Sequence, residues 1–361
     1  MICETYKMRR EQYHTAGGGF CKMCYKVLAL VIFTLILLQY LYTSFPQAPA
    51  FISDVPYNLT RHEPLFLPSV SEASPEDVKN LSAWMYFQIT PASTGETLPL
   101  CPLIPPNLLG HLGEVPASNP PPEPHVLPGG QWRPEQCRSR DRVALVVPYR
   151  DRKQILMTFL AHMHPFLQRQ LLDYGLFVIE QAGTDDFNRA MLMNIGFVEA
   201  LGMREFDCFI FHDVDLLPED DRNLYTCPNQ PRHMSVAVNV HNYRLPYPDI
   251  FGGVSAMTRA HFEAVNGFSN VFWGWGGEDD DMAARIKAAG LEITRYPKSI
   301  ARYTMLPHIK QKANPRRFQQ LYSGAKRRKT DGLNSLQYRR LELRLTKLFT
   351  WVLVELSRPP S

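Results

Sequence analysis

The segment Val143-Ala-Leu-Val-Val147 is a short, wholly apolar run that ends at a proline, as expected of a buried β-strand. Two similar runs, Leu176-Phe-Val-Ile179 and Cys208-Phe-Ile-Phe211, follow it at intervals of about thirty residues. A helical spacing of apolar residues occupies each of the two gaps, over 155–167 and 187–201. This alternation predicts a βαβαβ unit and therefore an α/β fold with a doubly wound, mostly parallel sheet.

The residues directly after these runs are the first candidates for a binding site, because ligands of such sheets bind beyond the carboxyl ends of the strands. Asp213 and Asp215 follow the third run on one face of the chain, where two carboxylates suit a hard divalent cation that bridges phosphate oxygens. Arg150 and Arg152 follow the first run, and paired guanidinium groups suit a diphosphate. An Asp-rich surface turn is the alternative interpretation of the two carboxylates.

The overall composition excludes several classes of protein. The chain has 361 residues, of which 45% are hydrophobic and 20% charged, so it is neither a disulfide mini-protein nor disordered throughout. Its 39 Lys and Arg against 35 Asp and Glu give a net charge of +4, which is too even for a nucleic-acid-binding surface.

The N-terminal region predicts a membrane anchor. Residues 27–45 carry no charge and are long enough to cross about 30 Å of hydrocarbon as a helix. Five basic and two acidic side chains precede them, a net of +3 that places residues 1–26 in the cytosol by the positive-inside rule. A cleaved signal peptide is the alternative.

The part beyond the anchor is then lumenal or extracellular. Eighteen of the 30 prolines fall between Pro46 and Pro134, so we expect a stem over 46–135 and a catalytic domain over 136–361. Asn58 and Asn80 are acceptors for N-glycosylation in this stem. Four cysteines lie beyond the anchor: Cys101, Cys137, Cys208 and Cys227. An even number in an oxidising compartment predicts two disulfides, in one of three possible pairings.

The run Phe272-Trp-Gly-Trp-Gly-Gly-Glu-Asp-Asp-Asp281 has the features of a sugar site. Glycines let a ligand approach the backbone, tryptophans offer flat apolar faces, and carboxylates supply acceptors or a base. The alternative is that the last two aspartates cap a helix over 282–289, and we adopt it for Asp281. Glu278 and Asp279 remain catalytic candidates.

The segment Met305-Leu-Pro-His308 looks different. Residue types alone favour packing over metal ligation there, because a thioether is a soft donor.

Four motifs together resemble the β-1,4-galactosyltransferase family: Phe211-His-Asp-Val-Asp-Leu-Leu-Pro218, Phe251-Gly-Gly-Val-Ser255, Trp273-Gly-Trp-Gly-Gly-Glu-Asp-Asp-Asp281 and Asp331-Gly-Leu-Asn-Ser335. The resemblance runs from about Cys101 to the C-terminus. It implies a GT-A glycosyltransferase fold, a Golgi type II membrane protein with a lumenal catalytic domain, and a requirement for Mn²⁺. The implied reaction is inverting transfer from a UDP-sugar donor to the 4-hydroxyl of terminal GlcNAc on a glycoprotein or glycolipid.

The same resemblance implies roles for individual residues. The metal ligands fall on Asp215, Met305 and His308, the general base on Asp279, and the disulfides on Cys101–Cys137 and Cys208–Cys227. The donor-binding positions are Pro148, Tyr149, Arg150, Asp151, Arg152, Phe187, Asn188, Arg189, Asp213, Val214, Asp215, Ile250, Gly253, Trp275 and His308. The acceptor-binding positions are Tyr247, Gly277, Glu278, Asp279, Asp280 and Arg317.

Ile250 points to the identity of the donor. Members of the resembled family that use UDP-galactose usually have Tyr here, and a shorter aliphatic side chain leaves space for an N-acetyl group. The sequence therefore predicts a β-1,4-N-acetylgalactosaminyltransferase that uses UDP-GalNAc. The alternatives are a galactosyltransferase with the same acceptor, an inactive lumenal sugar-binding protein, and a hydrolase that uses the paired carboxylates.

Overall fold

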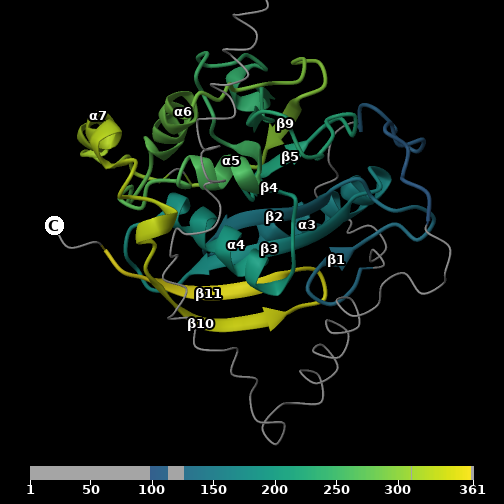
Figure 1. Cartoon of the computed structure of the whole chain (residues 1–361), viewed down its shortest axis with the longest axis horizontal. Helices are drawn as coiled ribbons and strands as arrows, with labels where there is room; N and C mark the ends of the chain where they lie inside the picture. Colours follow the sequence, from purple (N-terminus) through teal and green to yellow (C-terminus); the bar gives the residue numbers. More distant parts are fainter. Residues whose placement is uncertain (1–97, 113–125, 310, 359–361) are drawn as a thin grey trace, which may run out of the picture. The chain divides into compact units, whose positions relative to one another are not determined.

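The computed structural model describes residues 98–112, 126–309 and 311–358 (Figure 1). The chain divides into two compact units between Pro64 and Leu65, and every described residue belongs to the second unit. In this described part, no helix has the length and apolar character needed to cross a membrane. The predicted anchor over 27–45 and the glycosylation acceptors Asn58 and Asn80 lie outside it.

The three predicted strands form the centre of the main sheet. They are β2 (Arg142–Tyr149), β3 (Asp173–Gln181) and β4 (Cys208–His212), and β2 pairs in parallel with both of the others. The two predicted helices connect them as α3 (Lys153–Arg169) and α4 (Arg189–Met203). The βαβαβ unit is confirmed.

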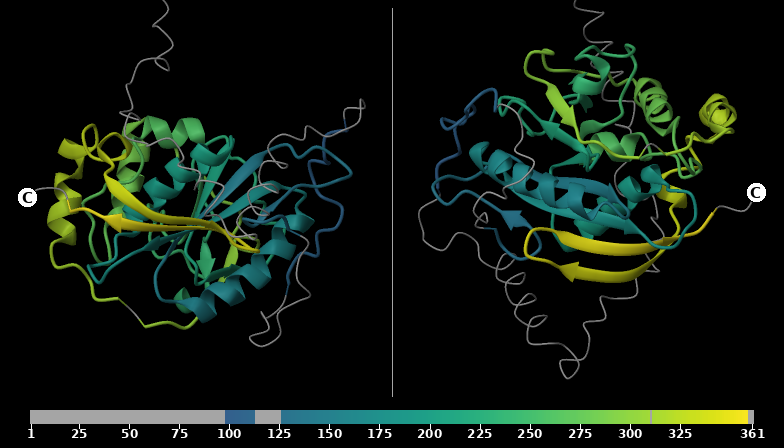
Figure 2. Two further views of the ribbon diagram at one scale, coloured as in Figure 1. Left: turned by 90° about the horizontal axis from the view of Figure 1, so that it is seen from below. Right: turned by 180° about the vertical axis from the view of Figure 1, so that it is seen from behind.

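The alternation of β2 explains why helices cover both faces of the sheet. Val143, Leu145 and Val147 are fully buried in one apolar cluster with α3. Ala144 and Val146 are fully buried in a second cluster with α4, and the two layers can be followed in Figure 2. The sheet is therefore doubly wound, as predicted.

The sheet is mixed, so the expectation of a mostly parallel sheet is wrong. Its strand order is β10-β11-β3-β2-β4-β8-β6, and β1 (Gln131–Trp132) pairs antiparallel with β3. Three further strands are antiparallel to their neighbours: β6 (Arg232–His233), β8 (Val254–Thr258) and β10 (Tyr338–Leu345). The strand β11 (Thr350–Leu356) pairs in parallel with β3. A tight connection forces β10 and β11 into an antiparallel hairpin, whereas parallel pairing needs a long crossover.

A second, smaller sheet carries part of the site. It consists of β5 (Leu216–Pro218), β9 (Arg302–Met305) and β7 (Ala237–Val238), and a short 3-10 helix, η2 (Asn239–His241), follows β7. The remaining helices of the described part are α5 (Arg259–Ala264), α6 (Glu278–Ala288) and α7 (Arg317–Arg327), with a second 3-10 helix, η3 (Leu333–Ser335). Figure 1 shows β10 and β11 at one margin of the described part and β5, β9, α5 and α6 at the opposite margin.

The helix α6 begins earlier than the sequence predicts. Its N-cap is Gly277, in the left-handed conformation with φ 98°, so the residues from Glu278 to Asp281 form its first turn. Asp281 is 2% exposed and accepts a 2.6 Å hydrogen bond from Nε of Arg285. The capping role assigned to Asp281 is therefore wrong, because its carboxylate is paired inside the protein.

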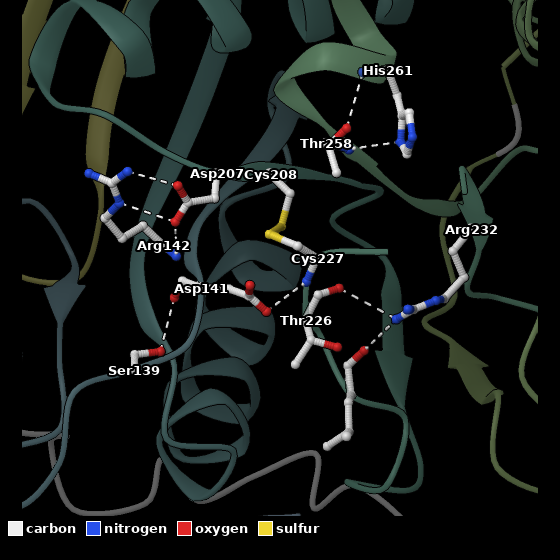
Figure 3. Close-up of a disulfide and its surroundings, with 11 residues drawn as sticks. Ser139, Asp141, Arg142, Asp207, Cys208, Thr226, Cys227, Arg232, Thr258 and His261 are labelled. Carbon is white, nitrogen blue, oxygen red and sulfur yellow. Dashed lines mark hydrogen bonds and ion pairs between the residues drawn. A yellow bond between two sulfur atoms is a disulfide. The ribbon is translucent and has the colours of Figure 1, made fainter. Parts of the chain in front are cut away.

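Both implied disulfides are present, Cys101–Cys137 and Cys208–Cys227. Around the second, the Asp141 carboxylate accepts the Cys227 N–H at 3.0 Å, and Arg232 donates to the Thr226 carbonyl at 3.4 Å (Figure 3). Residues of the predicted stem also contact the main sheet and the loops around it. Gln131 and Trp132 form β1, which pairs with β3, and the Gly110 N–H donates to the Asp221 carboxylate at 2.8 Å. The disulfides and these contacts hold the segments around the sheet in place.

Candidate functional site

Asp215, Met305 and His308 come together although about ninety residues separate the first from the other two. Antiparallel pairing of β5 with β9 places Met305 opposite Leu216, the neighbour of Asp215. Nδ1 of His308 lies 3.1 Å from Oδ2 of Asp215. The three ligands implied by the resemblance are thus adjacent, and His308 faces a carboxylate.

Asp215 is only 6% exposed and has two cationic or basic neighbours. Its Oδ2 also accepts a 2.8 Å hydrogen bond from Nη1 of Arg152. Burial and the charge of Asp213 raise the pKa of Asp215, while His308 and Arg152 act in the opposite direction. In the described ranges no group of three or more His, Cys, Asp or Glu forms a metal site. A carboxylate, an imidazole and the Met305 thioether are the donors that this position offers, and an oxygen and a nitrogen that face each other fit a divalent cation.

Arg189 is the centre of a second group of predicted residues. Its Nε donates to Asp213 at 2.5 Å, its Nη2 to the Gly253 carbonyl at 3.3 Å, and its Nη1 to Glu278 at 3.5 Å. Arg189 starts α4, Asp213 follows β4, and Glu278 starts α6. One guanidinium therefore joins the donor-side carboxylate to the predicted catalytic turn.

The end of β2 supplies an arginine beside an aromatic ring. Nη1 of Arg150 donates to the Asp185 carbonyl at 2.7 Å, and its guanidinium lies 5.4 Å from the centre of the Phe187 ring. Phe187 is half-buried, and its carbonyl accepts the Gly274 N–H at 2.9 Å. The ring is thus fixed next to the predicted diphosphate-binding arginines, where it offers a flat face to a ligand base.

Asn188, a predicted donor-binding position, has its side chain bound within the protein. It is fully buried and is the N-cap of α4, where its side chain accepts the Met191 N–H at 2.9 Å. Its Nδ2 donates to the Asn270 carbonyl at 2.9 Å. Both ends of the amide are therefore bound within the protein, and Asn188 fixes the start of the helix that carries Arg189.

Asp279 has the surroundings of a general base. Its carboxylate packs against Gly252, where a Cβ atom would overlap with Oδ2 of Asp279. Burial, together with the charges of Glu278 and Asp280, raises the pKa of Asp279 to about 7. Such a carboxyl accepts a proton efficiently near neutral pH.

Three further predicted site residues contact the same turn or one another. The Tyr247 hydroxyl donates to Asp280 at 2.8 Å. Trp275 is 58% exposed, and the Arg317 guanidinium lies 5.8 Å from the centre of its ring. Trp273, in contrast, is buried in the core, so only one of the two tryptophans of the motif presents its face.

Two further residues position the site and were not predicted. Nη2 of Arg295 donates to the carbonyls of Pro248 at 2.7 Å and Ile250 at 2.8 Å, and so fixes the backbone at residue 250. No local pattern marks Arg295, because its partners lie more than forty residues away. Gly252 could have been found from the sequence, because the paired glycines in Phe251-Gly-Gly253 indicate a close approach of another group to the backbone.

Comparisons with known proteins agree with this geometry. Residues 101–228 match the N-terminal region of glycosyl transferase group 7, and residues 232–309 match the N-terminal domain of galactosyltransferase. The chain is 47% identical over 283 residues to beta-1,4-galactosyltransferase 3 of Cricetulus griseus, covering 74% of this chain and 71% of that protein. It is 39% identical over 360 residues to beta-1,4-galactosyltransferase 2 of the same organism, covering 96% and 97% of the two chains.

A solved structure is similar as well. The catalytic domain of Drosophila beta1,4galactosyltransferase 7 in complex with xylobiose aligns with a TM-score of 0.52 and 33% identity, covering 60% of this chain and 94% of that one. A mutant of that enzyme in complex with manganese, UDP-Gal and xylobiose aligns equally well, at 32% identity. The fold is therefore GT-A-like, and the chain belongs to the β-1,4-galactosyltransferase family of glycosyltransferases.

Proposed function

We propose that this enzyme transfers GalNAc from UDP-GalNAc to the 4-hydroxyl of a terminal GlcNAc, with inversion. The observation that carries the proposal is the placement of Asp279, with its raised pKa, against Gly252 in the turn that also contains Ile250. This placement puts a base next to the residue that we expect to select the donor.

The mechanism needs one proton transfer and one displacement. Asp279 takes the proton of the acceptor 4-hydroxyl, and the resulting oxygen attacks the anomeric carbon from the face opposite UDP. The C–O bond to UDP breaks as the new glycosidic bond forms, so no covalent enzyme intermediate is required. In this proposal Arg150 and Arg152 bind the diphosphate, and the exposed Trp275 stacks on a sugar face.

Mn²⁺ is part of the proposal, supported by the manganese complex of the Drosophila relative. Asp215, Met305 and His308 would hold it. When bound, such an ion supplies positive charge that stabilises the departing diphosphate.

Replacement of His308 by alanine tests the ligand set. His308→Ala removes the imidazole that faces Asp215 at 3.1 Å, so we expect Mn²⁺-supported transfer to be lost or to need far more Mn²⁺. Initial rates over a Mn²⁺ titration measure this, with the exposed His241→Gln as the control. A variant with the wild-type rate at low Mn²⁺ would show that the ligand set is wrong.

The donor preference rests on Ile250. A Tyr at this place would meet an N-acetyl group on C2 of the sugar, whereas Ile leaves an apolar wall for the acetyl methyl. Removing that clash and burying one methyl group contributes about 1–3 kcal/mol, a ten- to hundredfold preference. Because Arg295 fixes the backbone carbonyl of Ile250 at 2.8 Å, a substitution here changes the side chain and not the path of the chain.

Competition between UDP-GalNAc and UDP-galactose for one GlcNAc acceptor tests this preference. We expect the wild type to favour UDP-GalNAc and Ile250→Tyr to shift the preference toward UDP-galactose. Ile250→Leu is the matched control, because it keeps the apolar surface and should keep the donor. A wild type that prefers UDP-galactose, or a Tyr variant with unchanged preference, contradicts the proposal.

UDP-galactose transfer to the same acceptor is the second candidate. The names of the relatives, beta-1,4-galactosyltransferases 2 and 3, favour it directly. The same competition assay separates the two donors, and donor turnover without transfer would instead indicate a hydrolase.

We further propose that the enzyme is a single-pass type II protein of the Golgi membrane with its catalytic domain in the lumen. This proposal rests on the uncharged segment 27–45 and the basic residues before it. Immunofluorescence of the full chain with a Golgi marker tests this location.

A further inference from the structure

A chain of buried polar side chains crosses the apolar core beneath the site. Nε2 of His212 lies 2.9 Å from the Tyr225 hydroxyl, which lies 3.0 Å from the Tyr303 hydroxyl. Nδ2 of Asn223 donates to the Tyr303 hydroxyl at 3.0 Å. All four residues are fully buried, and Tyr225 and Tyr303 belong to the cluster that packs on α3.

A neutral imidazole fixes the direction of the hydrogen bonds along this chain. Burial lowers the pKa of His212 to about 3, so the ring is neutral. The Asp213 carbonyl, 2.9 Å from Nδ1 of His212, can only accept, so Nδ1 carries the proton and Nε2 must accept. Tyr225 then donates to Nε2, Tyr303 donates to Tyr225, and the Asn223 amide nitrogen donates to Tyr303. In this arrangement each hydroxyl donates once and accepts once, and the imidazole is neutral.

The chain joins the two segments that carry the candidate metal ligands. His212 ends β4 and directly precedes Asp213-Val-Asp215. Tyr303 lies on β9 opposite Pro218, two residues before Met305 and five before His308. Tyr225 lies two residues before Cys227, whose disulfide with Cys208 ties this loop to the first residue of β4 (Figure 3). The polar chain therefore spans the distance between the Asp215 segment and the Met305–His308 segment.

Apolar side chains would fill this part of the core at lower cost. Phe159 contacts the His212 ring edge-on at 5.0 Å, and Phe166 contacts Tyr225 at 5.2 Å, so the surroundings are those of an ordinary aromatic core. Burying hydroxyls and an imidazole there is tolerated because both hydroxyls and both ring nitrogens have partners, although Oδ1 of Asn223 has none in the described part of the chain. Directional bonds, unlike apolar contacts, specify one distance and one orientation between the elements that they join.

We propose that His212, Tyr225 and Tyr303 are positioning residues that hold the Asp215 segment and the Met305–His308 segment at the separation needed for Mn²⁺. The inference rests on the proposed function, because it takes these residues as the metal ligands. Groups that orient metal ligands typically change metal affinity about ten- to hundredfold when removed. Because Tyr225 and Tyr303 act through the backbone of the ligand segments, we expect the lower end of that range.

The test compares Tyr225→Phe and Tyr303→Phe with the wild type in the full-length protein. Each variant removes one hydroxyl and keeps the ring, so packing is retained. Electron paramagnetic resonance of Mn²⁺ measures binding of the metal alone, without donor or acceptor. We expect each variant to bind Mn²⁺ about tenfold more weakly. Because the two hydroxyls belong to one chain, the double variant should lose little more affinity than either single variant.

Tyr174→Phe is the matched control. The Tyr174 hydroxyl is also buried and lies 2.7 Å from Nδ1 of His164, so the variant removes the same kind of bond. Tyr174 lies at the start of β3, far along the strand from its carboxyl end. We expect Tyr174→Phe to bind Mn²⁺ like the wild type even where it lowers stability.

A kinetic measurement separates positioning from general destabilisation. In Tyr225→Phe and Tyr303→Phe, the Mn²⁺ concentration for half-maximal rate should rise while kcat at saturating Mn²⁺ stays near that of the wild type. Wild-type Mn²⁺ affinity in both variants, or equal weakening in Tyr174→Phe, would overturn the inference. A wild-type protein that binds no Mn²⁺ would instead overturn the metal part of the proposed function, and this inference with it.

Discussion

Asp280 adds a negative charge beside Asp279, and the Tyr247 hydroxyl holds it there at 2.8 Å. That charge is one reason why the pKa of Asp279 is raised to about 7, after burial and Glu278. A base works only when ionised, so kcat/KM should fall as the pH drops through this pKa. In Asp280→Asn the pKa of Asp279 decreases, and we expect the acidic limb of the pH profile to move down by about one unit.

The pH dependence of kcat/KM for the acceptor measures this shift. Asp249→Asn is the control, because Asp249 is an exposed carboxylate paired with Lys287. An acidic limb at the same pH in Asp280→Asn and in the wild type would exclude Asp279 as the titrating base.

At the scale of single residues, residue types alone point to the candidate carboxylates but not to two of the candidate metal ligands. Glu278 and Asp279 follow from residue types alone, because glycines, tryptophans and acids rarely gather in one run. Met305 and His308 required the family resemblance, since their approach to Asp215 depends on the pairing of β5 with β9. That pairing joins residues far apart in the chain and leaves no local signal.

Among the elements, α6 and α7 meet where Gly324 packs on the buried Asp281. A Cβ at Gly324 would overlap with Oδ1 of Asp281, so Gly324→Ala should push α7 away from α6 at a cost of about 1–3 kcal/mol in unfolding free energy. Because α7 begins with Arg317, the acceptor KM should rise while the donor KM changes little. Steady-state kinetics with each substrate varied in turn test this, with the exposed neighbour Ala325→Ser as control. Equal changes in both KM values would contradict it.

The central parallel strands were predictable because each is a full apolar run and a helix separates each strand from the next. The strands β5, β6 and β7 have two or three residues each, too few to show alternation. The antiparallel strand β8 was missed because Val254-Ser-Ala-Met-Thr258 mixes small and polar side chains, which burial between β4 and β6 tolerates. Short strands of this kind are defined by their neighbours in space.

For the whole molecule, buried histidines make stability depend on pH. Burial lowers the pKa of His162 and His164 to about 4 and that of His212 and His233 to about 3. In the unfolded chain these imidazoles take up a proton near pH 6.5, whereas in the folded protein they stay neutral down to about pH 4. The folded state therefore loses stability relative to the unfolded state as the pH falls from 6.5 toward 4. Each such imidazole lowers the free energy of unfolding by up to about 1.4 kcal/mol per pH unit in this range. Asp279, with its raised pKa, acts in the opposite direction.

Urea unfolding at a series of pH values between 7.5 and 4.5 measures this slope. His164→Gln removes one buried imidazole, so it should reduce the dependence of the free energy of unfolding on pH by the contribution of that one group. The exposed His241→Gln should leave the slope unchanged. An unchanged slope in His164→Gln would show that this imidazole does not lose stability on protonation.

The position of β11 has a consequence for how the protein is made. This strand is the last along the chain, yet it lies inside the sheet between β10 and β3. During synthesis β3 leaves the ribosome long before β11 exists, so the edge of β3 over residues 177–181 stays unpaired until residues 350–356 have been made. An unpaired strand edge invites association with other chains. A nascent chain that stalls before Thr350 would already contain Asp215, Asp279 and His308, but it would expose that edge and become a substrate for chaperones and proteases.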